Sequence, residues 1–353
     1  MTSGQLPLVA QPEQLTETLR RAGVLDSNAV THASIETSRN TILSSINRLR
    51  LSYAAPEAGA PLTLIYKTCH PDRLGNADWD PGRQEVQFYN EIATKTHGRL
   101  IPRCFQAEWN SVTRMWHILL EDLAATHTIA TAWPLPPTLQ QCTAIVRARA
   151  RFQAEWWDDP RFGEGIGKWL PADDKQILSF EAAFARFVER EGDRLSEERR
   201  DLYRRLIDNV RQLNRRYHSH RNMTIVQGDA HFWNCFLPKD GGDDVRLFDW
   251  DCWRIDVGTD DLAYAIAMHW YPDRRRRFEH QLLDEYHATL VANGVAGYDR
   301  SALESDYRLS VLWQIATPVW QSNGNIPPLI WWNNLERIML AVDDLDCRSL
   351  LLK

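Results

Sequence analysis

The chain has 353 residues, longer than one typical domain, which predicts two lobes or two domains. Its net charge of −6, from 41 Lys and Arg against 47 Asp and Glu, provides no general attraction to nucleic acid. The first residues contain neither a signal-like apolar core nor a stretch long enough to span a bilayer. We therefore expect a cytoplasmic protein with no nucleic-acid or membrane partner. Six cysteines without a C-x-x-C pair indicate reduced thiols rather than a zinc site or disulfides.

The first part of the chain is predicted to be rich in strands. A helix is expected over 11–24, where Leu15, Leu19 and Val24 are spaced as on one helical face. A second helix is expected over 82–96, because apolar residues recur there at steps of three and four. Strands are expected over 42–51, 62–67 and 115–123. One helix packed on an antiparallel sheet accounts for this part, which ends near residue 123.

The rest of the chain is predicted to be mainly helical. A strand-rich insert at 224–251 interrupts the helical patterns. We therefore expect an α+β protein with a small mixed lobe, 1–123, and a larger helical lobe, 124–353. The predicted helices of the second lobe are 138–157, 172–190, 195–218, 260–270, 275–293, 300–321 and 328–345.

Polar residues with catalytic potential gather at a predicted β-hairpin. Two apolar stretches flank "DGGD", with Gly241-Gly242 as a two-residue turn. That turn places Asn234 opposite Asp249, with β-carbons about 4.5–5.5 Å apart. The amide oxygen of Asn234 and the carboxylate of Asp249 are suitable ligands for Mg²⁺. Asp229, in the preceding loop, remains free to accept a proton. Taken singly, such residues are more often caps or turn formers.

Two segments, "VQGDAHFWN" and "LFDWDCWRIDVGTDDLA", resemble motifs of the aminoglycoside phosphotransferase and choline kinase superfamily. The family pattern is His-Gly-Asp with an Asn five residues after the Asp, then a hydrophobic-Asp-Trp and a Gly-x-x-x-Asp-Leu-Ala-type segment. The resemblance implies a two-lobe, protein-kinase-like fold with a nucleotide-binding lobe over 1–123 and a catalytic, acceptor-binding lobe over 124–353. It also implies transfer of the γ-phosphoryl group of ATP or GTP to a hydroxyl of a small-molecule alcohol.

The resemblance assigns the chemistry of the second lobe to three residues. Asp229 matches the catalytic Asp, which positions the acceptor hydroxyl and takes its proton. Asn234 and Asp249 match the Mg²⁺ ligands. Asp261 matches an Asp that braces the catalytic loop, although it could equally cap the helix that follows.

The nucleotide-binding residues of the first lobe follow from the same resemblance. Lys67 matches the lysine that pairs with the α- and β-phosphates. Glu85 matches its ion-pair partner, with Glu91 as the alternative. The phosphate-covering loop falls on "IETSRNTILSS", which lacks a Gly-rich motif and offers Ser38, Asn40 and Thr41 as donors. The adenine-binding hinge falls on "LLEDLA", residues 119–124, around Glu121.

The sequence departs from the family pattern at two glutamines. Gln227 replaces the usual His before Gly-Asp, and Gln153 stands where relatives often carry a His. A Gln still donates and accepts hydrogen bonds, so we expect the chemistry to remain possible. His231, two residues after the catalytic Asp, is expected to stabilise the loop rather than act as a second base.

The acceptor and the activity are less well specified. Fifteen Trp, several of them beyond residue 250, favour a hydroxylated acceptor that is cationic or sugar-like. The alternative is a catalytically weak, kinase-fold nucleotide-binding protein that acts through a partner, for which Gln227 is the only support. A protein substrate is disfavoured, because the eleven residues between Asp249 and Asp261 contain no recognisable peptide-docking segment.

Overall fold

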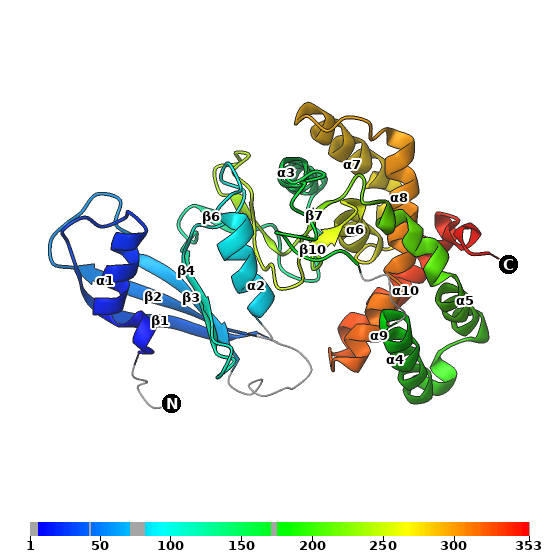
Figure 1. Cartoon of the computed structure of the whole chain (residues 1–353), viewed down its shortest axis with the longest axis horizontal. Helices are drawn as coiled ribbons and strands as arrows, with labels where there is room; N and C mark the ends of the chain where they lie inside the picture. The colour runs from blue at the N-terminus through cyan, green and yellow to red at the C-terminus, as the bar shows by residue number, and fades with distance from the viewer. Residues whose placement is uncertain (1–5, 42–43, 71–81, 171–174, 353) are drawn as a thin grey trace. The chain divides into compact units, whose positions relative to one another are not determined.

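A computed structural model describes residues 6–41, 44–70, 82–170 and 175–352 of the chain. It divides into two compact units, which Figure 1 shows in sequence colours. Unit 1 comprises Met1–Thr128 and Phe236–Cys252, and unit 2 comprises Ile129–Cys235 and Trp253–Lys353. Residues 42–43 and 172–174, which the sequence assigns to predicted elements, lie outside the described residues.

Unit 1 is built on an antiparallel sheet of five strands in the order β1-β2-β3-β5-β4. The two edge strands, β1 and β4, are absent from the sequence prediction. Most side chains of β1 are exposed polar groups, so the strand lacks the alternation that marks a half-buried strand. The strands are β1 (Val30–Asn40), β2 (Ser44–Tyr53), β3 (Thr63–Cys69), β4 (Cys104–Trp109) and β5 (Trp116–Glu121).

The two faces of this sheet have different partners. On one face, Leu15 and Leu19 of α1 (Pro12–Arg21) share a buried cluster with Leu64 and Tyr66 of β3. Because neighbouring strand residues point to opposite faces, Lys67 faces away from this core. On that other face lies α2 (Arg83–Phe88), which continues as a π-helical turn at Tyr89–Ala93. The predicted helix is therefore present, with a change of helical pitch at its centre.

A second, three-stranded sheet has the order β6-β8-β9 and contains β6 (His127–Ile129), β8 (Cys235–Pro238) and β9 (Arg246–Leu247). The predicted two-residue turn is wrong, because residues 239–245 connect β8 to β9. The Lys239 amide donates to the Thr126 carbonyl, and the Asp240 carboxylate accepts from the Gly242 amide. These two bonds hold the β8–β9 connection as a loop wider than a two-residue turn. Asn234 and Asp249 both lie outside the strands, so their predicted position opposite each other stays a prediction.

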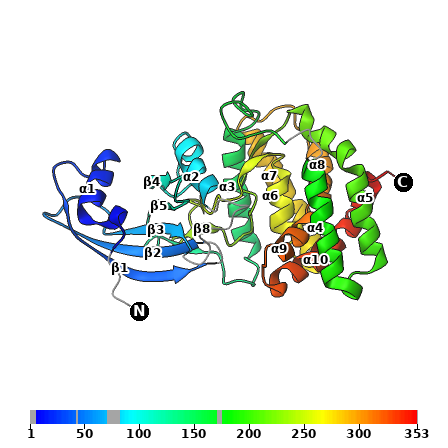
Figure 2. The same ribbon diagram turned by 60° about the horizontal axis from the view of Figure 1, so that its bottom comes forward.

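Unit 2 is mainly helical, as predicted, and Figure 2 shows its helices from a second direction. A short pair of strands, β7 (Thr224–Val226) and β10 (Arg254–Asp256), is embedded among them. Within the described residues, every helix is too short or too polar to cross a membrane. The helices are α3 (Leu139–Glu155), α4 (Lys175–Glu191), α5 (Glu197–Leu213), α6 (Thr259–Leu262), α7 (Pro272–Ala292), α8 (Arg300–Trp313), α9 (Ala316–Asn323) and α10 (Pro328–Asp344).

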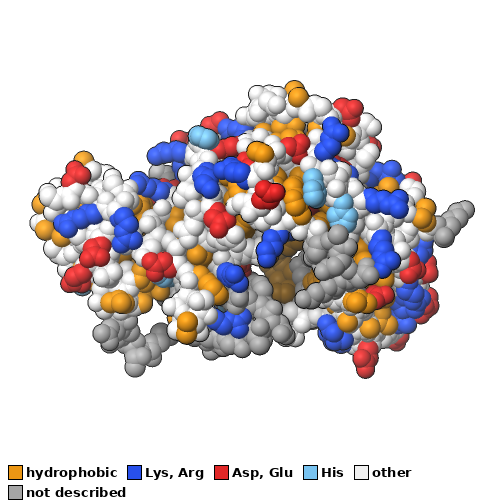
Figure 3. Space-filling view, in the orientation of Figure 1, with side chains coloured by type: hydrophobic (Ala, Val, Ile, Leu, Met, Phe, Trp, Pro, Cys, Tyr) orange, Lys and Arg blue, Asp and Glu red, His pale blue; other side chains and the backbone are white. Residues whose placement is uncertain are grey.

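The helix predicted over 300–321 is in fact two helices, α8 and α9. Pro318 lacks the amide that would bond the Gln314 carbonyl in a continuous helix. The carbonyl of Ile315, at the break, instead accepts a hydrogen bond of 2.7 Å from the buried Tyr203 hydroxyl. Figure 3 shows basic and acidic side chains mixed over the face in view, consistent with the modest net charge of −6.

A buried ion pair joins successive turns of α7. Arg275 and Glu279 are 1% and 2% exposed, and Arg275 Nη1 lies 2.9 Å from Glu279 Oε2. The Tyr307 hydroxyl of α8 donates to the other Glu279 oxygen at 2.7 Å. Arg275 also pairs with Asp344 of α10. These contacts connect three helices around one cation, so loss of the cation would leave Glu279 charged and buried.

We expect Arg275→Leu to lower the unfolding free energy of unit 2 by about 3–5 kcal/mol, because breaking a buried pair leaves an uncompensated charge. The double variant Arg275→Leu/Glu279→Leu should recover most of that loss. Urea denaturation followed by circular dichroism measures both. Arg276→Leu is the control, since its side chain is 65% exposed, and it should change stability by less than about 1 kcal/mol. Equal losses in the single and double variants would contradict this account.

Candidate active site

Lys67 forms the centre of a charged cluster in unit 1. Its Nζ lies 2.6 Å from Glu85 Oε2 and 2.8 Å from Asp249 Oδ1. Burial alone would disfavour the charged lysine, but the charges of Asp249 and Glu85 outweigh it and raise the pKa of Lys67. Burial raises the pKa of Glu85, while Lys67 opposes that shift. Lys67 therefore pairs with Glu85, the first choice from the sequence, and Glu91 instead accepts from Gln87.

The segment that carries Asp249 is fixed by its neighbours. Trp250 stacks on Phe88 of α2 with ring centroids 3.9 Å apart, and its Nε1 donates to the Leu247 carbonyl. Asp249 itself has φ 68°, a left-handed conformation that is uncommon for residues other than glycine. The Phe88–Trp250 stack thus holds the helix of Glu85 and the segment of Asp249 together, which keeps both carboxylates at Lys67.

A second carboxylate, Asp251, follows on the same segment. Burial, together with the charge of Asp249, raises the pKa of Asp251 to about 6. Its Oδ1 accepts a hydrogen bond of 3.0 Å from the amide of Gly82, at the start of α2. Gly82 has φ 76°, and a β-carbon there would lie 2.1 Å from the ring of Trp116, so only glycine fits. The close approach of this amide to Asp251 depends on that glycine.

The predicted phosphate-covering residues lie at the β1–β2 connection. Ser38 and Asn40 are in β1, and Thr41 follows that strand directly. The Thr41 hydroxyl accepts a hydrogen bond of 2.9 Å from the Ser44 amide at the start of β2. The structure thus groups the three residues at one end of the sheet.

Glu121, the predicted hinge residue, has its backbone amide and its carboxylate engaged within unit 1. The amide donates to the Arg103 carbonyl at 2.9 Å. The carboxylate accepts from the Arg103 amide at 2.8 Å and from Arg246 Nη1 at 2.9 Å. The Glu121 amide is therefore not free to bond adenine.

Asp229 and Asn234 are neighbours in unit 2. The Asn234 side-chain amide donates to the Asp229 carbonyl at 2.9 Å and approaches Asp229 Oδ2 at 3.3 Å. With Nδ2 directed at Asp229, Asn234 Oδ1 is left to accept a ligand or donor. The Asp229 side chain is 36% exposed, so its carboxylate can meet a substrate. The five-residue spacing seen in the sequence thus corresponds to a direct contact.

Asp261 braces the loop that leads to Asp229. Its Oδ1 accepts from the Gly228 amide and its Oδ2 from the Gln227 amide, both at 3.0 Å. Arg149 Nη1 donates to Oδ2 at 2.6 Å. The alternative role of Asp261 as a helix cap is wrong. Helix α6 begins at Thr259 and its N-cap residue is Gly258, so Asp261 lies inside the helix. Asp261 satisfies two consecutive amides immediately before Asp229.

Both unusual glutamines belong to this brace and are fully buried. Gln227 Oε1 accepts from Arg149 Nη2 at 3.0 Å. Gln153 Nε2 donates to Asp261 Oδ2 at 3.0 Å, and Gln153 Oε1 accepts from the Tyr286 hydroxyl at 2.6 Å. The sequence analysis missed Arg149, although an arginine among the apolar residues of a predicted helix signals a buried carboxylate partner.

An aromatic group lies beside Asp229 in unit 2. His231 Nε2 is 3.6 Å from Asp229 Oδ2, and the His231 ring lies within 6.5 Å of the rings of Trp233, Tyr264 and His269. Burial lowers the pKa of His269 to about 3, so that ring is neutral. Among the described residues, His231 Nδ1 and Trp233 Nε1 are buried without a hydrogen-bond partner. Two polar atoms next to Asp229 are thus left for a ligand.

The candidate metal ligands are oxygen atoms. Within the described ranges, no group of three or more His, Cys, Asp or Glu side chains could hold a metal ion. In unit 1, Asp249 and Asp251 are two repelling carboxylates that a cation would stabilise. In unit 2, considered by itself, Asn234 Oδ1 is oriented to accept. These donors fit Mg²⁺, which commonly takes one or two protein carboxylates together with substrate phosphates and water.

Comparison with known proteins gives a partial family match and several similar folds. Residues 166–294 match the model of the ecdysteroid kinase-like family. Choline kinase from Cryptosporidium parvum Iowa II shares the fold at a TM-score of 0.57 and 10% identity, covering 96% of this chain and 97% of that chain. Amicoumacin kinase hAmiN, solved with AMP-PNP, Ca²⁺ and Ami, does so at a TM-score of 0.55 and 13% identity, covering 95% and 96%. No curated protein sequence matches the chain.

The shared fold extends over nearly the whole chain, whereas the family match covers its central part. At these identities the solved structures establish the architecture alone. The predicted α+β, protein-kinase-like fold is therefore confirmed. The partial match to the ecdysteroid kinase-like family and the fold shared with two small-molecule kinases both agree with the resemblance seen in the sequence motifs.

Proposed function

We propose that the protein transfers the γ-phosphoryl group of ATP or GTP to a hydroxyl of a small-molecule alcohol. The observation that carries the proposal is the buried Lys67–Glu85 ion pair, with Asp249 on the same lysine. An isolated buried lysine is costly, and the two carboxylates hold this ammonium in one position, which supports its proposed role of contacting phosphates. The amicoumacin kinase with bound AMP-PNP shows that this fold accommodates a nucleotide.

Each residue has a distinct part in the proposed reaction. Lys67, oriented by Glu85, contacts the α- and β-phosphates. Asp229 accepts the proton of the acceptor hydroxyl, and the Asn234 amide keeps that carboxylate in place. Asn234 and Asp249 are the proposed Mg²⁺ ligands; Mg²⁺ bound there would neutralise charge on the β- and γ-phosphates. Phosphoryl transfer relies on such alignment and charge stabilisation more than on covalent chemistry.

The rest of the nucleotide contacts are assigned to backbone and hydroxyl groups. Ser38, Asn40 and Thr41 are proposed to contact phosphates at the β1–β2 connection. Because the amides of Glu121 and Ala124 are both engaged, the adenine contacts are assigned to the backbone of Asp122 and Leu123. The Asp122 carboxylate accepts from the Ala124 amide at 2.9 Å and pairs with Arg48, which fixes that backbone.

The alternative of a catalytically weak protein loses its support from Gln227. This side chain accepts from Arg149, and its own backbone amide is bonded to Asp261. The loop that holds Asp229 is therefore braced without the usual histidine. We keep the alternative as an outcome of the experiments below.

Asp229→Asn should reduce phosphoryl transfer by about 10²–10⁴-fold, the usual contribution of a positioned base. The substitution keeps the shape of the side chain and the Asn234 bond to the Asp229 carbonyl, so the fold and nucleotide affinity should persist. Product formation is measured by mass spectrometry across aminoglycosides, choline, ethanolamine, sugars, macrolides and steroid alcohols. Asp240→Asn, in the exposed β8–β9 loop, is the charge-matched control. Retention of more than about a tenth of the activity would remove Asp229 from its proposed role.

Lys67→Met should weaken nucleotide binding and give the protein a new pH dependence. Without the lysine, the pKa of buried Glu85 rises further above its ordinary value. A carboxyl whose pKa is higher in the folded state makes that state less stable as pH rises. We expect the variant to lose up to about 1.4 kcal/mol per pH unit between about pH 5 and about pH 8, more steeply than the parent. Thermal unfolding at several pH values measures this, and Lys67→Met/Glu85→Gln should abolish the added slope.

Gln227→His tests whether the glutamine limits activity. Because Gln227 already accepts the Arg149 bond, restoring the family's usual residue should change the turnover number by less than about fivefold. Steady-state kinetics with the acceptor found in the panel measures the effect. A rise above about tenfold would favour the catalytically weak alternative.

A further inference from the structure

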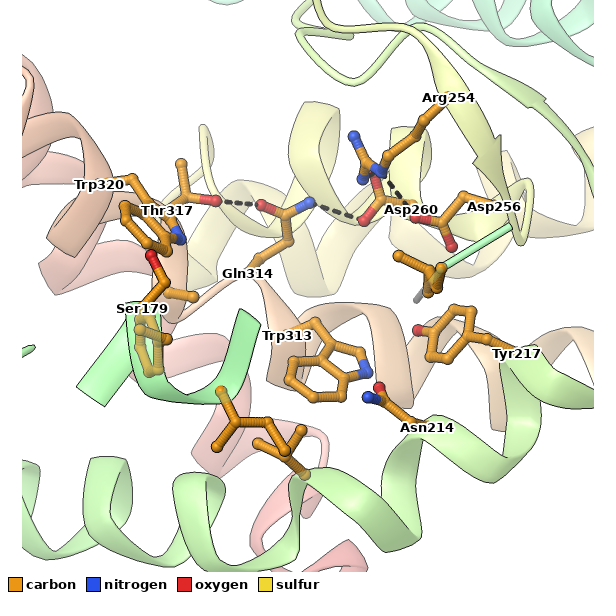
Figure 4. Close-up of a pocket in the computed structure, with 15 residues that line it drawn as sticks. Ser179, Asn214, Tyr217, Arg254, Asp256, Asp260, Trp313, Gln314, Thr317 and Trp320 are labelled. Atoms are coloured by element: carbon orange, nitrogen blue, oxygen red, sulfur yellow. Dashed lines mark hydrogen bonds and ion pairs between the residues drawn. The ribbon is translucent and has the colours of Figure 1, made fainter. Parts of the chain in front are cut away.

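Each unit contains a cavity, and the polar groups in the two walls are arranged differently. The larger cavity, of about 560 Å³, lies in unit 2 and is drawn in Figure 4. Its polar groups form a connected chain, in which Thr317 donates to Gln314 and Gln314 donates to Asp260, the partner of Arg254. The smaller cavity, of about 320 Å³, lies wholly within unit 1. Its volume is at the small end of the range for ligand pockets, which suits a small metabolite.

The walls of the unit 1 cavity include both segments that hold Lys67. One wall is the π-helical turn that continues α2, and its residue Tyr89 follows Glu85 by four positions, about one helical turn. Another wall is β9, where Arg246 lines the cavity three residues before Asp249. A ligand in this space would therefore contact the two segments that present Glu85 and Asp249 to the lysine.

The side chain of Tyr89 is the clearest sign of a ligand. Tyr89 lines the cavity and is 1% exposed, and its hydroxyl is buried without a hydrogen-bond partner among the described residues. The hydroxyls of Thr94 and Thr96, in the same wall, donate instead to carbonyls of the π-helical turn, at 3.0 Å each. Buried hydroxyls are normally satisfied, so an acceptor atom of a ligand would complete Tyr89.

Glu121 and Arg246, which both line the cavity, offer an acceptor and donors next to each other. Arg246 Nη1 donates to Glu121 Oε1 at 2.9 Å, while Nε and Nη2 donate to Asp244. These bonds use three of the five guanidinium N–H groups, so two remain in a side chain that is 4% exposed. Glu121 Oε1 also accepts from the Arg103 amide, whereas Oε2 has no partner among the described residues. One acceptor and two donors thus remain on a single ion pair.

The charges around this ion pair balance. Arg246 pairs with both Asp244 and Glu121, and exposed Arg99 supplies the second positive charge of the cavity. The hydrogen bonds and charge of Arg246, assisted by Arg99, hold the pKa of Asp244 below its usual value, so that carboxylate stays ionised. The third arginine of the lining, Arg103, donates to a carbonyl outside the cavity. Two cations and two anions leave no charge for a ligand to neutralise, which favours a neutral ligand.

We propose that the unit 1 cavity binds a small neutral molecule with an amide group and a second acceptor, and that this ligand is an effector of nucleotide binding. An amide has an N–H donor and a carbonyl acceptor on adjacent atoms. The N–H donates to Glu121 Oε2, the carbonyl accepts from Arg246, and the second acceptor accepts from the Tyr89 hydroxyl. Ile101 and Pro102 contact the apolar part of the ligand. The effector role rests on the proposed function, whereas the ligand chemistry rests on the cavity alone.

Three flat molecules of nearly equal size test this chemistry by ligand-observed NMR titration of the full chain without nucleotide. Nicotinamide has the amide and a ring nitrogen as second acceptor, nicotinate has a carboxylate in place of the amide, and benzamide lacks the ring nitrogen. Nicotinate should bind at least about tenfold more weakly than nicotinamide, because its carboxylate repels Glu121 and offers no donor. Benzamide should bind about three- to tenfold more weakly, the loss of one hydrogen bond. Equal affinity for nicotinamide and nicotinate, or no saturable binding of nicotinamide, overturns the proposal.

Tyr89→Phe removes the hydroxyl alone, so the preference for nicotinamide over benzamide should fall to near unity while the preference over nicotinate remains. Tyr53→Phe is the control, because the Tyr53 hydroxyl donates to the Pro61 carbonyl outside the cavity, and it should keep both preferences. A preference over benzamide that persists in Tyr89→Phe contradicts the assigned contact.

Glu121→Gln keeps an oxygen for the Arg103 amide and puts an N–H donor in place of Oε2. Nicotinate should then bind at least as tightly as nicotinamide. Glu108→Gln is the charge-matched control, since Glu108 is exposed on β4 outside the cavity. Rejection of nicotinate that persists in Glu121→Gln contradicts the proposal. If Glu121→Gln does not fold, Tyr89→Phe and the three molecules on the parent protein decide the question.

AMP-PNP with Mg²⁺ distinguishes this cavity from the proposed nucleotide site. Among the described residues that line the cavity, none is Lys67, Asp122 or Leu123, the proposed nucleotide contacts. Nicotinamide should therefore stay bound at saturating AMP-PNP. It should also raise the affinity for AMP-PNP by about threefold, because it holds the segments of Glu85 and Asp249 together. Calorimetry with and without saturating nicotinamide measures this change.

The outcomes separate the cavity from the proposed function. Displacement of nicotinamide by AMP-PNP assigns it to the nucleotide site and overturns the proposal. Selective binding of nicotinamide with an unchanged affinity for AMP-PNP overturns the effector role. A chain that binds nicotinamide selectively but does not bind AMP-PNP upholds the cavity chemistry and counts against the phosphotransferase.

Discussion

The buried carboxylate of Asp261 is the group on which the proposed chemistry of unit 2 depends. It accepts from two consecutive amides, Gln227 and Gly228, and its charge is matched by Arg149. A hydrogen bond from a backbone amide to a charged carboxylate is stronger than one to a neutral acceptor. The Asp261 carboxylate accepts two such bonds, from the two residues directly before Asp229. The position of the proposed base is therefore set by a residue far along the chain rather than by the loop's own sequence.

The same arrangement explains why two glutamines can replace two histidines. Gln227 uses its oxygen toward Arg149, whereas Gln153 uses its nitrogen toward Asp261 and its oxygen toward Tyr286. An amide side chain provides a donor and an acceptor at once without taking up a proton. This brace should then keep the same hydrogen bonds over the pH range in which a histidine would change its charge.

Motif spacing predicted the protein-kinase-like fold and grouped the residues that the structure brings together within each unit. Asp229 contacts Asn234, and Lys67 pairs with Glu85 and Asp249, although their roles toward a nucleotide stay proposals. The errors have local physical causes. Strand β1 is an exposed edge without alternation, and the β8–β9 turn is widened by the side-chain and backbone bonds of Lys239 and Asp240. Arg149 bonds Asp261, which lies 112 residues away in the sequence, and the periodicity of one segment cannot predict such a distant contact.

The composition of unit 1 has a consequence for how the chain is made. Phe236–Cys252 belong to that unit, with strands β8 and β9, the Lys67 partner Asp249 and the Phe88 partner Trp250. The ribosome adds these residues only after the whole first segment of unit 2, Ile129–Cys235, has been synthesised. The amino-terminal unit cannot complete itself first, as independent domains usually do during synthesis. A cut at residue 128 would likewise release a sheet without the aromatic ring and the carboxylate that complete it.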